Sequence, residues 1–218
     1  MHAQPPKRIV LGVSGASGAL YTQRLLSHLL ELGHEVHFTI TDAGKRLIFD
    51  ELGLKFPQNA AQLAGLDPAI EPVELRHHNL YLHPIKDIGA DIASGSFLHD
   101  GMVVMPASAH TLNAIASGIG DNLLCRAAAV ALKERRPLVI AHRESPLTLI
   151  DIQNMERLTL AGAIIMPTNP GFYLLPKTID EIVDFVVAKA LDLLKIEHTL
   201  SKRWSSDLEA AHRNRDEL

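Results

Sequence analysis

The feature that most constrains this chain is the alternation of short apolar runs with longer segments of helical periodicity. Residues 8–13 form a short β-rich run, a glycine-rich turn follows, and residues 19–32 place leucines at helical spacing. The same order recurs three times. These pairs are 35–41 with 42–52, 101–105 with 108–117, and 137–141 with 148–160. Strands that alternate with helices form βαβ units, so the sequence predicts a three-layer α/β/α, doubly wound parallel sheet.

Three further segments extend this pattern, and one region is harder to interpret. The additional segments are helices over 121–135 and 179–194 and a strand over 163–166. Residues 53–92 are rich in proline and glycine, with a short strand possible near 80–82. The strand at 101–105 is expected to end at Pro106, and the helix that begins near residue 42 is expected to be capped by Thr41 or Asp42.

Length and composition indicate a single domain. The chain has 218 residues, which suits one α/β domain, and 47% of them are apolar. Only 5% are aromatic, so the core is expected to consist of Leu, Ile, Val and Ala, as in buried parallel strands. We therefore expect one domain over 1–218, with a core over about 7–196 and a polar tail over 197–218.

Charge, cysteine content and hydropathy exclude several classes of partner. The formal net charge is −4, without the basic footprint of a nucleic-acid-binding protein. The single cysteine, Cys125, excludes an internal disulfide framework and a cysteine-rich zinc site. His77, His78 and His83 cluster without a spaced metal motif, so no metal is expected. The first residues are polar and no run reaches transmembrane length, so we expect no membrane association and a cytoplasmic protein.

The turn after the first strand is one candidate for a ligand site. It contains Gly12, Gly15 and Gly18 at three-residue spacing, with Ser14 and Ser17 between them. Small residues let backbone N–H groups approach an anion at a helix N-terminus, and the serine hydroxyls add donors. The spacing differs from that of the dinucleotide-binding fingerprint. We favour phosphate or flavin binding here; the alternative is a tight strand–helix turn without a ligand.

A second candidate loop follows the strand at 101–105. In open α/β sheets, ligands bind outside the carboxyl ends of the strands. The loops after residues 13, 40, 105 and 141 are therefore expected to converge. Ser108, His110, Thr111 and Asn113 offer hydroxyls, an imidazole and an amide that suit a phosphate or a ring edge. The alternative is an ordinary helix cap made by Ser108.

Charged and phenolic residues mark the remaining loops. Arg143 and Glu144 come just after a buried strand, where charge is costly unless it is paired or used, and Lys133 could face the same cleft. The alternative is a local Arg143–Glu144 pair. Tyr173 lies in a rigid Pro/Gly loop, and Lys189 lies on the amphipathic helix at 179–194, where it could simply extend to solvent.

Eight short segments, taken in order, make the chain similar to a known family. They are 12–18, 93–96, 105–108, 126–138, 143–146, 154–155, 162–167 and 170–173. Their order and spacing resemble those of the UbiX/Pad-type flavin prenyltransferases over about residues 7–204. The resemblance implies a flavodoxin-like (Rossmann-like) fold and a metal-independent enzyme. Such an enzyme joins a dimethylallyl group from dimethylallyl phosphate to N5 and C6 of reduced FMN. It also implies a homo-dodecamer and a UbiD-type decarboxylase that receives the prenylated FMN.

The resemblance further implies roles for individual residues. FMN would be held by Gly15, Ala16, Ser17, Thr41, Ser108, Ala109, His110, Thr111 and Arg143. The prenyl phosphate would be bound by Arg126, Lys133, Tyr173 and Lys189. Catalysis would involve Glu144, Glu51, Ser17, Lys133 and Trp204. Glu51 or Glu144 would move a proton, and Trp204, in the tail, would shelter positive charge with its π face.

Four positions depart from the family pattern. His110, Asp42 and Ala107 stand where other residues are common, a lysine at position 42 and a cysteine at position 107. Lys189 stands where arginine also occurs, so the charge would remain while bidentate phosphate recognition would be lost.

Two other functions would use the same flavin loops. One is an FMN-dependent decarboxylase of the cysteine or 4'-phosphopantothenoylcysteine type, which would use FMN as a redox cofactor. That enzyme has no need of Lys133, Tyr173, Lys189 and Trp204 together. The other is a non-catalytic FMN-binding carrier that stores flavin for a partner enzyme.

Overall fold

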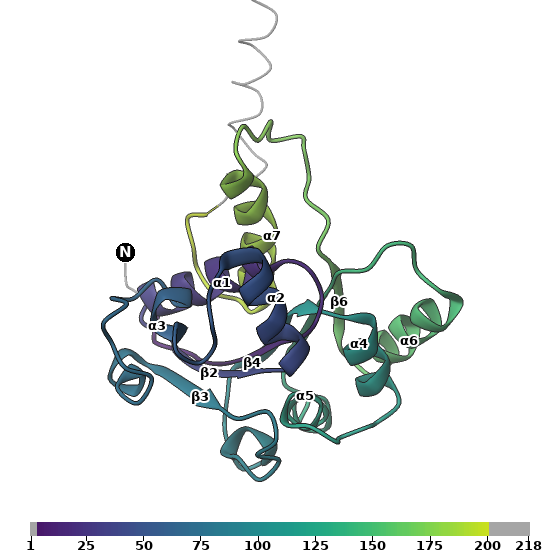
Figure 1. Cartoon of the computed structure of the whole chain (residues 1–218). Helices are drawn as coiled ribbons and strands as arrows, with labels where there is room; N and C mark the ends of the chain where they lie inside the picture. The colour runs from purple at the N-terminus through teal and green to yellow at the C-terminus, as the bar shows by residue number, and fades with distance from the viewer. Residues whose placement is uncertain (1–3, 201–218) are drawn as a thin grey trace, which may run out of the picture.

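The computed structural model describes residues 4–200 and consists of a six-stranded sheet between two layers of helices (Figure 1). The strands are β1 (Arg8–Val13), β2 (Glu35–Ile40), β3 (Leu80–His83), β4 (Gly101–Ala107), β5 (Leu138–His142) and β6 (Ile164–Pro167). Their order is β3-β2-β1-β4-β5-β6, and every pair is parallel. The predicted three-layer, doubly wound sheet is confirmed, with the strand order of the Rossmann type.

The helices divide between the two faces of the sheet. One face carries α1 (Ala19–Glu31), α2 (Asp42–Leu52), the short α3 (Ala60–Leu63) and α7 (Ile179–Leu193). The other carries α4 (Ala109–Ala116), α5 (Leu123–Lys133) and α6 (Leu149–Leu160). Two short 3₁₀ helices are η1 (Leu75–His78) and η2 (Asp91–Ala93). Figure 1 shows α5 across the sheet from α1 and α7.

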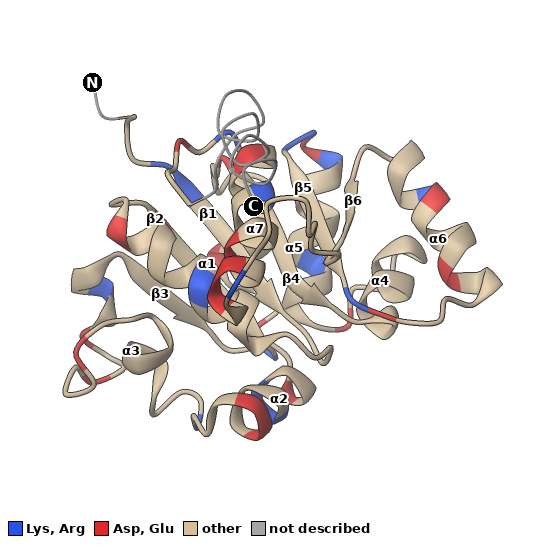
Figure 2. Ribbon diagram, turned by 90° about the horizontal axis from the view of Figure 1, so that it is seen from above, with Lys and Arg blue, Asp and Glu red and all other residues tan. Residues whose placement is uncertain are grey.

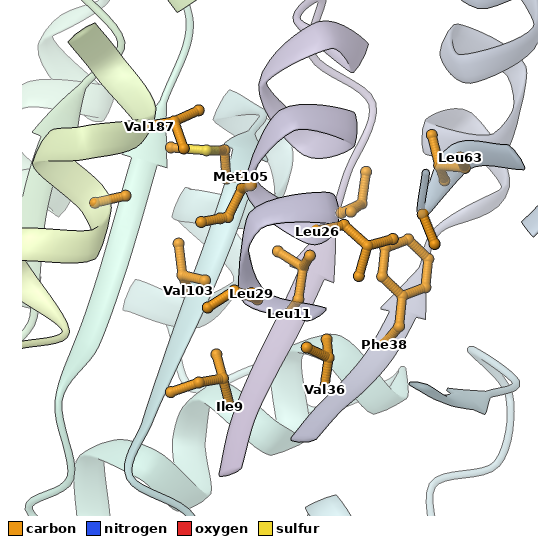
Figure 3. Packing of buried hydrophobic residues seen from close by; sticks show 14 of the residues in the cluster. Ile9, Leu11, Leu26, Leu29, Val36, Phe38, Leu63, Val103, Met105 and Val187 are labelled. Carbon is orange, nitrogen blue, oxygen red and sulfur yellow. The ribbon is translucent and has the colours of Figure 1, made fainter. Parts of the chain in front are cut away.

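Aliphatic side chains fill the space between the sheet and the helical layer that contains α1 and α7. One hydrophobic cluster contains Ile9, Leu11 and Val103 of the central strands together with Leu26 and Leu29 of α1 (Figure 3). All five are at most 1% exposed, and burial of each such side chain contributes roughly 1.5–3 kcal/mol. The low aromatic content therefore matches a core built from branched aliphatic residues.

Side-chain caps determine where most helices begin. Five helices start after a residue whose side chain accepts a hydrogen bond from a first-turn N–H: Thr41 for α2, Ser108 for α4, Asn122 for α5, Thr148 for α6 and Thr178 for α7. Such caps satisfy donors that the helix itself leaves free. The predicted cap of α2 is thus confirmed as Thr41.

Most boundaries lie within one residue of the predictions, and the larger differences are at the end of β4 and at both ends of α5. β4 does not stop at Pro106 but continues to Ala107, and its register with β5 shifts between Val104 and Ala107. The irregular register accommodates a proline, which has no N–H to give to the neighbouring strand. The helix predicted from residue 121 begins only at Leu123, because Asn122 forms its cap.

The strand order reverses between β1 and β4, and a serine joins these two strands at their carboxyl ends. The Ser14 hydroxyl donates to the Pro106 carbonyl at 3.1 Å and accepts from the Ser108 N–H at 2.8 Å. In doubly wound sheets the crevice at such a reversal is where ligands bind. Within residues 4–200, no helix is long and apolar enough to cross a membrane.

Candidate active site

A cavity of about 640 Å³ lies at the carboxyl edge of the sheet, where the strand order reverses. Its volume is within the range of small-molecule and cofactor sites. The lining residues are Gly15, Thr41, Asp42, Ala43, Ile85, Lys86, Ser108, Ala109, His110, Thr111, Asp121, Asn122 and Glu144. The loops after β1, β2, β4 and β5 all contribute, so the predicted convergence of four loops is confirmed.

Gly15 lets two of these loops approach each other. A Cβ atom at Gly15 would lie 2.5 Å from the Cβ of Ala43, much closer than real Cβ atoms come. Gly15 follows β1 and Ala43 lies in the first turn of α2, and both line the cavity. The absence of a side chain at position 15 therefore sets the shape of this wall.

The remainder of the glycine-rich turn is used within the protein. The N–H groups of Gly18 and Ala19, at the start of α1, donate to the Glu51 carboxylate, the shorter bond measuring 2.8 Å. The expectation that the Ser14 hydroxyl would serve a ligand is wrong in this structure, because Ser14 is buried and joins β1 to β4. Ser17 is exposed beside these groups.

The start of α4 offers donors to the cavity. The Ser108 hydroxyl accepts from the Thr111 N–H at 3.3 Å, which confirms its role as a cap. The N–H groups of Ala109 and His110 lie outside the hydrogen-bond ladder of the helix. All four residues line the cavity, and a helix N-terminus favours an anion. Residues 108–111 therefore form the best-placed phosphate site in the cavity.

Asn113, one turn further along α4, does not serve the cavity. Its amide donates to the Asp151 carboxylate at 2.9 Å and accepts from the Asn154 amide at 2.9 Å. Asp151 and Asn154 belong to α6, so this side chain joins α4 to α6. The prediction that Asn113 contacts a ligand is therefore replaced by a structural role.

Glu144 enters the site from the end of β5, and Arg143 directly precedes it without lining the cavity. Glu144 lines the cavity, and its carboxylate accepts from the Ser145 N–H at 3.1 Å. The Nε of Arg143 is buried and has no hydrogen-bond partner among residues 4–200. The ion pairs of the described chain do not include Arg143 with Glu144. Because a buried unpaired donor is costly, Arg143 fits a site that binds an anion.

Lys133 is far from this cavity within one chain. α5 begins beside the cavity at Asn122 and ends at Lys133, and its 11 residues span about 16 Å. The Lys133 ammonium lies 2.6 Å from the Glu134 carboxylate, shortly before the amino end of β5. The expectation that Lys133 faces the same cleft as Glu144 is therefore wrong for a single chain. Arg126, one turn after Asn122, stays close to the cavity rim beside Gly120.

The other proposed prenyl-phosphate ligands lie along α7. Tyr173 is about half exposed, and its ring packs edge-on against Phe185, with centroids 5.6 Å apart. Phe185 and Lys189 are four residues apart on α7 and share one helix face. Tyr173 and Lys189 are thus brought to one face of α7, but neither lines the cavity. Trp204 lies outside the described residues.

Several lining residues were not predicted. Ile85 and Lys86 follow β3, and Asp121 and Asn122 precede α5. β3 lies in the region where proline and glycine obscure the periodicity, so the sequence indicates only a short strand near 80–82 and no site residues beside it. Asp42 also lines the cavity, and its hydrogen bond with Lys45 lowers the pKa of the Asp42 carboxyl. In the described chain, no group of three or more His, Cys, Asp or Glu residues is arranged to hold a metal ion.

The remaining predicted flavin contacts fit this arrangement in part. Thr41 lines the cavity while its hydroxyl accepts from the Gly44 N–H at 3.0 Å, which leaves its own proton free to donate. Ala16 is 4% exposed and does not line the cavity.

Comparison with known proteins gives a consistent family assignment. The profile of the flavoprotein family matches residues 1–191. The flavin prenyltransferase UbiX of Halalkalibacterium halodurans is 43% identical over 197 residues, covering 90% of this chain and 93% of that protein. The flavin prenyltransferase UbiX of Thauera aromatica is 42% identical over 202 residues, covering 93% and 96%.

Solved structures give the same result. AnUbiX (PadA1) in complex with FMN and dimethylallyl pyrophosphate is 37% identical, covers 92% of this chain and 98% of that chain, and has a TM-score of 0.82. A dodecameric FMN-dependent UbiX-like decarboxylase from Escherichia coli O157:H7 is also 37% identical, covers 91% and 100%, and has a TM-score of 0.80. This chain therefore belongs to the flavoprotein family and, within it, to the UbiX flavin prenyltransferases.

Proposed function

We propose that this chain joins a dimethylallyl group from dimethylallyl phosphate to N5 and C6 of reduced FMN. One observation carries the proposal. Three of the family segments, 12–18, 105–108 and 143–146, contribute residues to one cavity at the reversal of the strand order. Relatives that are 40–44% identical over nine-tenths of the chain carry the name flavin prenyltransferase.

The residues around the cavity fit FMN. The volume suits a cofactor, the first turn of α4 offers N–H groups and hydroxyls for a phosphate, and Arg143 has a buried donor without a protein partner. When bound and reduced, the flavin would supply the nucleophilic ring atoms that accept the dimethylallyl group. Gly15 would let the ring approach the backbone after β1, since any side chain there would meet Ala43.

We propose that one of two carboxylates moves protons in this reaction. Bond formation at N5 breaks the allylic C–O bond, and the departing phosphate leaves with the electron pair. Bond formation at C6 consumes the dimethylallyl double bond, which takes up a proton, so N5 and C6 each lose a proton and one ring proton is released overall. Glu144 lines the cavity and can accept that ring proton or protonate the phosphate oxygen. Glu51 is the second candidate, held 2.8 Å from the Ala19 N–H beside Ser17.

Cations and a phenol would stabilise the leaving phosphate. Two arginines lie near the cavity within one chain. Arg143 directly precedes the lining residue Glu144, and Arg126 lies beside Gly120, which directly precedes the lining residue Asp121. Lys133, Tyr173 and Lys189 do not line that cavity, so we propose that they reach the prenyl phosphate of a neighbouring subunit. Preorganised charges of this kind stabilise a transition state in which negative charge develops.

A site that takes residues from two subunits requires a homo-oligomer. The exposed face of α6 offers a surface for contact between subunits. Figure 2 shows α6 at the outer end of the molecule, beyond the edge strand β6. Its Leu149, Ile150, Ile152 and Leu160 are 51% to 82% exposed. Exposed apolar side chains gathered on one helix mark a protein interface. We propose a homo-dodecamer in the cytoplasm that passes prenylated FMN to a UbiD-type decarboxylase.

A second function is suggested by the names of two structural relatives. The UbiX-like protein from Escherichia coli is called an FMN-dependent decarboxylase, and a phenylacrylic acid decarboxylase from Aquifex aeolicus is 38% identical with a TM-score of 0.76. An FMN-dependent decarboxylase would bind flavin in the same cavity but release carbon dioxide and leave the flavin without a prenyl group. The cysteine decarboxylases, such as TvaF at 16% identity, share only the fold.

One assay separates these functions. The protein is incubated anaerobically with reduced FMN and dimethylallyl monophosphate, and the released flavin is analysed by mass spectrometry. We expect the flavin mass to increase by one dimethylallyl group in place of one hydrogen. A flavin of unchanged mass would contradict the prenyltransferase proposal. FMN bound tightly but unchanged would then favour the decarboxylase or the carrier.

A further inference from the structure

His142 connects three strands at the edge of the sheet that holds the cavity. It is the last residue of β5 and is 3% exposed. Its carbonyl accepts hydrogen bonds from the Thr168 N–H at 2.9 Å and the Thr168 hydroxyl at 3.3 Å, just after β6. Its Nδ1 lies 3.0 Å from the carbonyl oxygen of Ala107, the last residue of β4. One side chain and one carbonyl therefore hold the ends of β4, β5 and β6 together.

The hydrogen bond to Ala107 determines the tautomer of the ring. A carbonyl oxygen can only accept, so Nδ1 of His142 must carry the proton and Nε2 is left as an acceptor. Nε2 is buried and has no partner among residues 4–200. Burial lowers the pKa of His142 and Arg143 acts in the same direction, while the hydrogen bond to Ala107, followed by Asp151 and Glu144, acts in the opposite direction. The ring is therefore neutral near neutral pH.

This bond lies directly after the irregular part of the register between β4 and β5. The register shifts between Val104 and Ala107, and Pro106 has no N–H to donate. The Ala107 carbonyl accepts from the Arg143 N–H at 3.1 Å and from the His142 ring. The side chain of His142 thus supplies a second cross-strand bond directly after the irregular part of the pair.

The two segments joined by this bond both contribute residues to the cavity wall. Ala107 directly precedes Ser108, which caps α4 and begins the run of lining residues 108–111. His142 directly precedes Arg143 and is two residues before Glu144, which lines the cavity from the β5 side. A small displacement between Ala107 and His142 would therefore change the distance between the start of α4 and Glu144.

We propose that His142 is a positioning residue for the flavin cavity: its Nδ1–H bond to Ala107 sets the start of α4 against Arg143 and Glu144. The proposal rests on the proposed function only in taking FMN as the ligand. His142 does not line the cavity, so its effect on FMN is exerted through the residues on either side of it.

Two variants separate the two ring nitrogens. The amide nitrogen of asparagine occupies the place of Nδ1, so His142→Asn can keep the bond to Ala107. The terminal amide of glutamine occupies the place of Nε2, so His142→Gln loses that bond. We expect His142→Gln to weaken FMN binding about fivefold or more, the value of one hydrogen bond, and His142→Asn to stay within about twofold of the wild type. FMN affinity is measured by quenching of flavin fluorescence.

Thr168→Val is the matched control for a general loss of stability. It removes a hydrogen bond to His142 as well, but on the β6 side and through the carbonyl. We expect its melting temperature to fall about as far as that of His142→Gln while FMN affinity stays within about twofold of the wild type. Equal loss of FMN affinity in Thr168→Val and His142→Gln, or no rescue by His142→Asn, would overturn the proposal.

The tautomer gives a readout that needs no flavin. ¹⁵N NMR of the wild-type protein should show His142 with its proton on Nδ1, and a proton on Nε2 would overturn the proposal even if FMN binds. Wild-type protein that binds no FMN would instead contradict the proposed function, and the tautomer alone would then decide the role of His142.

Discussion

Replacing one α-hydrogen of Gly15 by a methyl group would bring the new Cβ within 2.5 Å of the Ala43 Cβ. One of the two loops must then move, and both line the cavity. We expect Gly15→Ala to weaken FMN binding by about tenfold or more, as measured by fluorescence titration. Gly89→Ala is the control, because its nearest neighbour would be the Asp87 carboxylate at 3.8 Å. Wild-type affinity in Gly15→Ala would show that flavin does not depend on this wall.

Glu144 is the carboxylate that lines the cavity, so its charge and proton can be tested by one substitution. Glu144→Gln keeps the size and removes the ability to move a proton. We expect FMN binding to be retained and prenyl transfer to slow by about a hundredfold or more, as for a lost general acid or base. Single-turnover flavin mass analysis measures the rate, with the exposed Glu71→Gln as the control. An unchanged rate would remove Glu144 from the reaction.

At the scale of elements, α6 depends on a network at its first turn. Thr148 and Asp151 form a capping box, and Asp151 also accepts from Asn113 of α4. These hydrogen bonds, that from Thr148 first, lower the pKa of the Asp151 carboxyl. We expect Asp151→Ala to lower the free energy of unfolding by about 2–3 kcal/mol in urea titrations. Thr178→Ala, which removes only the cap of α7, should cost about 1 kcal/mol. Equal losses would mean that the tie to α4 contributes nothing.

The elements also show what local sequence could predict. α2, α4 and α6 begin within one residue of their predicted starts, and Thr41, Ser108 and Thr148 form their caps. The convergence of four loops followed from the parallel sheet alone. The local sequence did not predict where Lys133 lies. α5 begins beside the cavity and runs away from it, so Lys133 lies near the amino ends of the strands. The bond from His142 to Ala107 depends on register across two strands, and no local pattern encodes it.

At the scale of the whole molecule, buried neutral histidines make stability depend on pH. His37 and His83 share a hydrogen bond of 2.8 Å, and burial lowers the pKa of His83 to about 4. Burial also lowers the pKa of His99 to about 4. In the unfolded chain these rings titrate near 6.5, so below that pH the unfolded state binds more protons. Stability is therefore fully present above pH 6.5 and is lost as pH falls toward 4.

We expect the free energy of unfolding to fall by about 2 kcal/mol or more between pH 7 and about pH 4.5. Lowered carboxyl pKa values, such as that of Asp151, act mainly below this window. Urea unfolding at a series of pH values measures the effect, and His83→Gln should flatten the curve. A wild-type stability that is constant over this range would contradict the neutral state of these histidines.

Assembly is the other property of the whole molecule. Leu149 and Ile152 are 68% and 51% exposed on α6. We expect the double substitution Leu149→Glu with Ile152→Lys to shift the protein to smaller species in size-exclusion chromatography with light scattering, because charges are costly in a buried interface. The melting temperature of the smaller species controls for unfolding. An unchanged assembly would show that α6 faces solvent in the oligomer.

We propose that the cavity at the reversal of the strand order holds the flavin. A crystal structure of the protein grown with FMN and dimethylallyl monophosphate tests it most directly. We expect flavin density in the space bounded by Gly15, Ser108 and Glu144, with residues 108–111 and Arg143 in contact with it. Flavin bound elsewhere on the protein, with this cavity empty, would contradict the proposal that the cavity holds FMN.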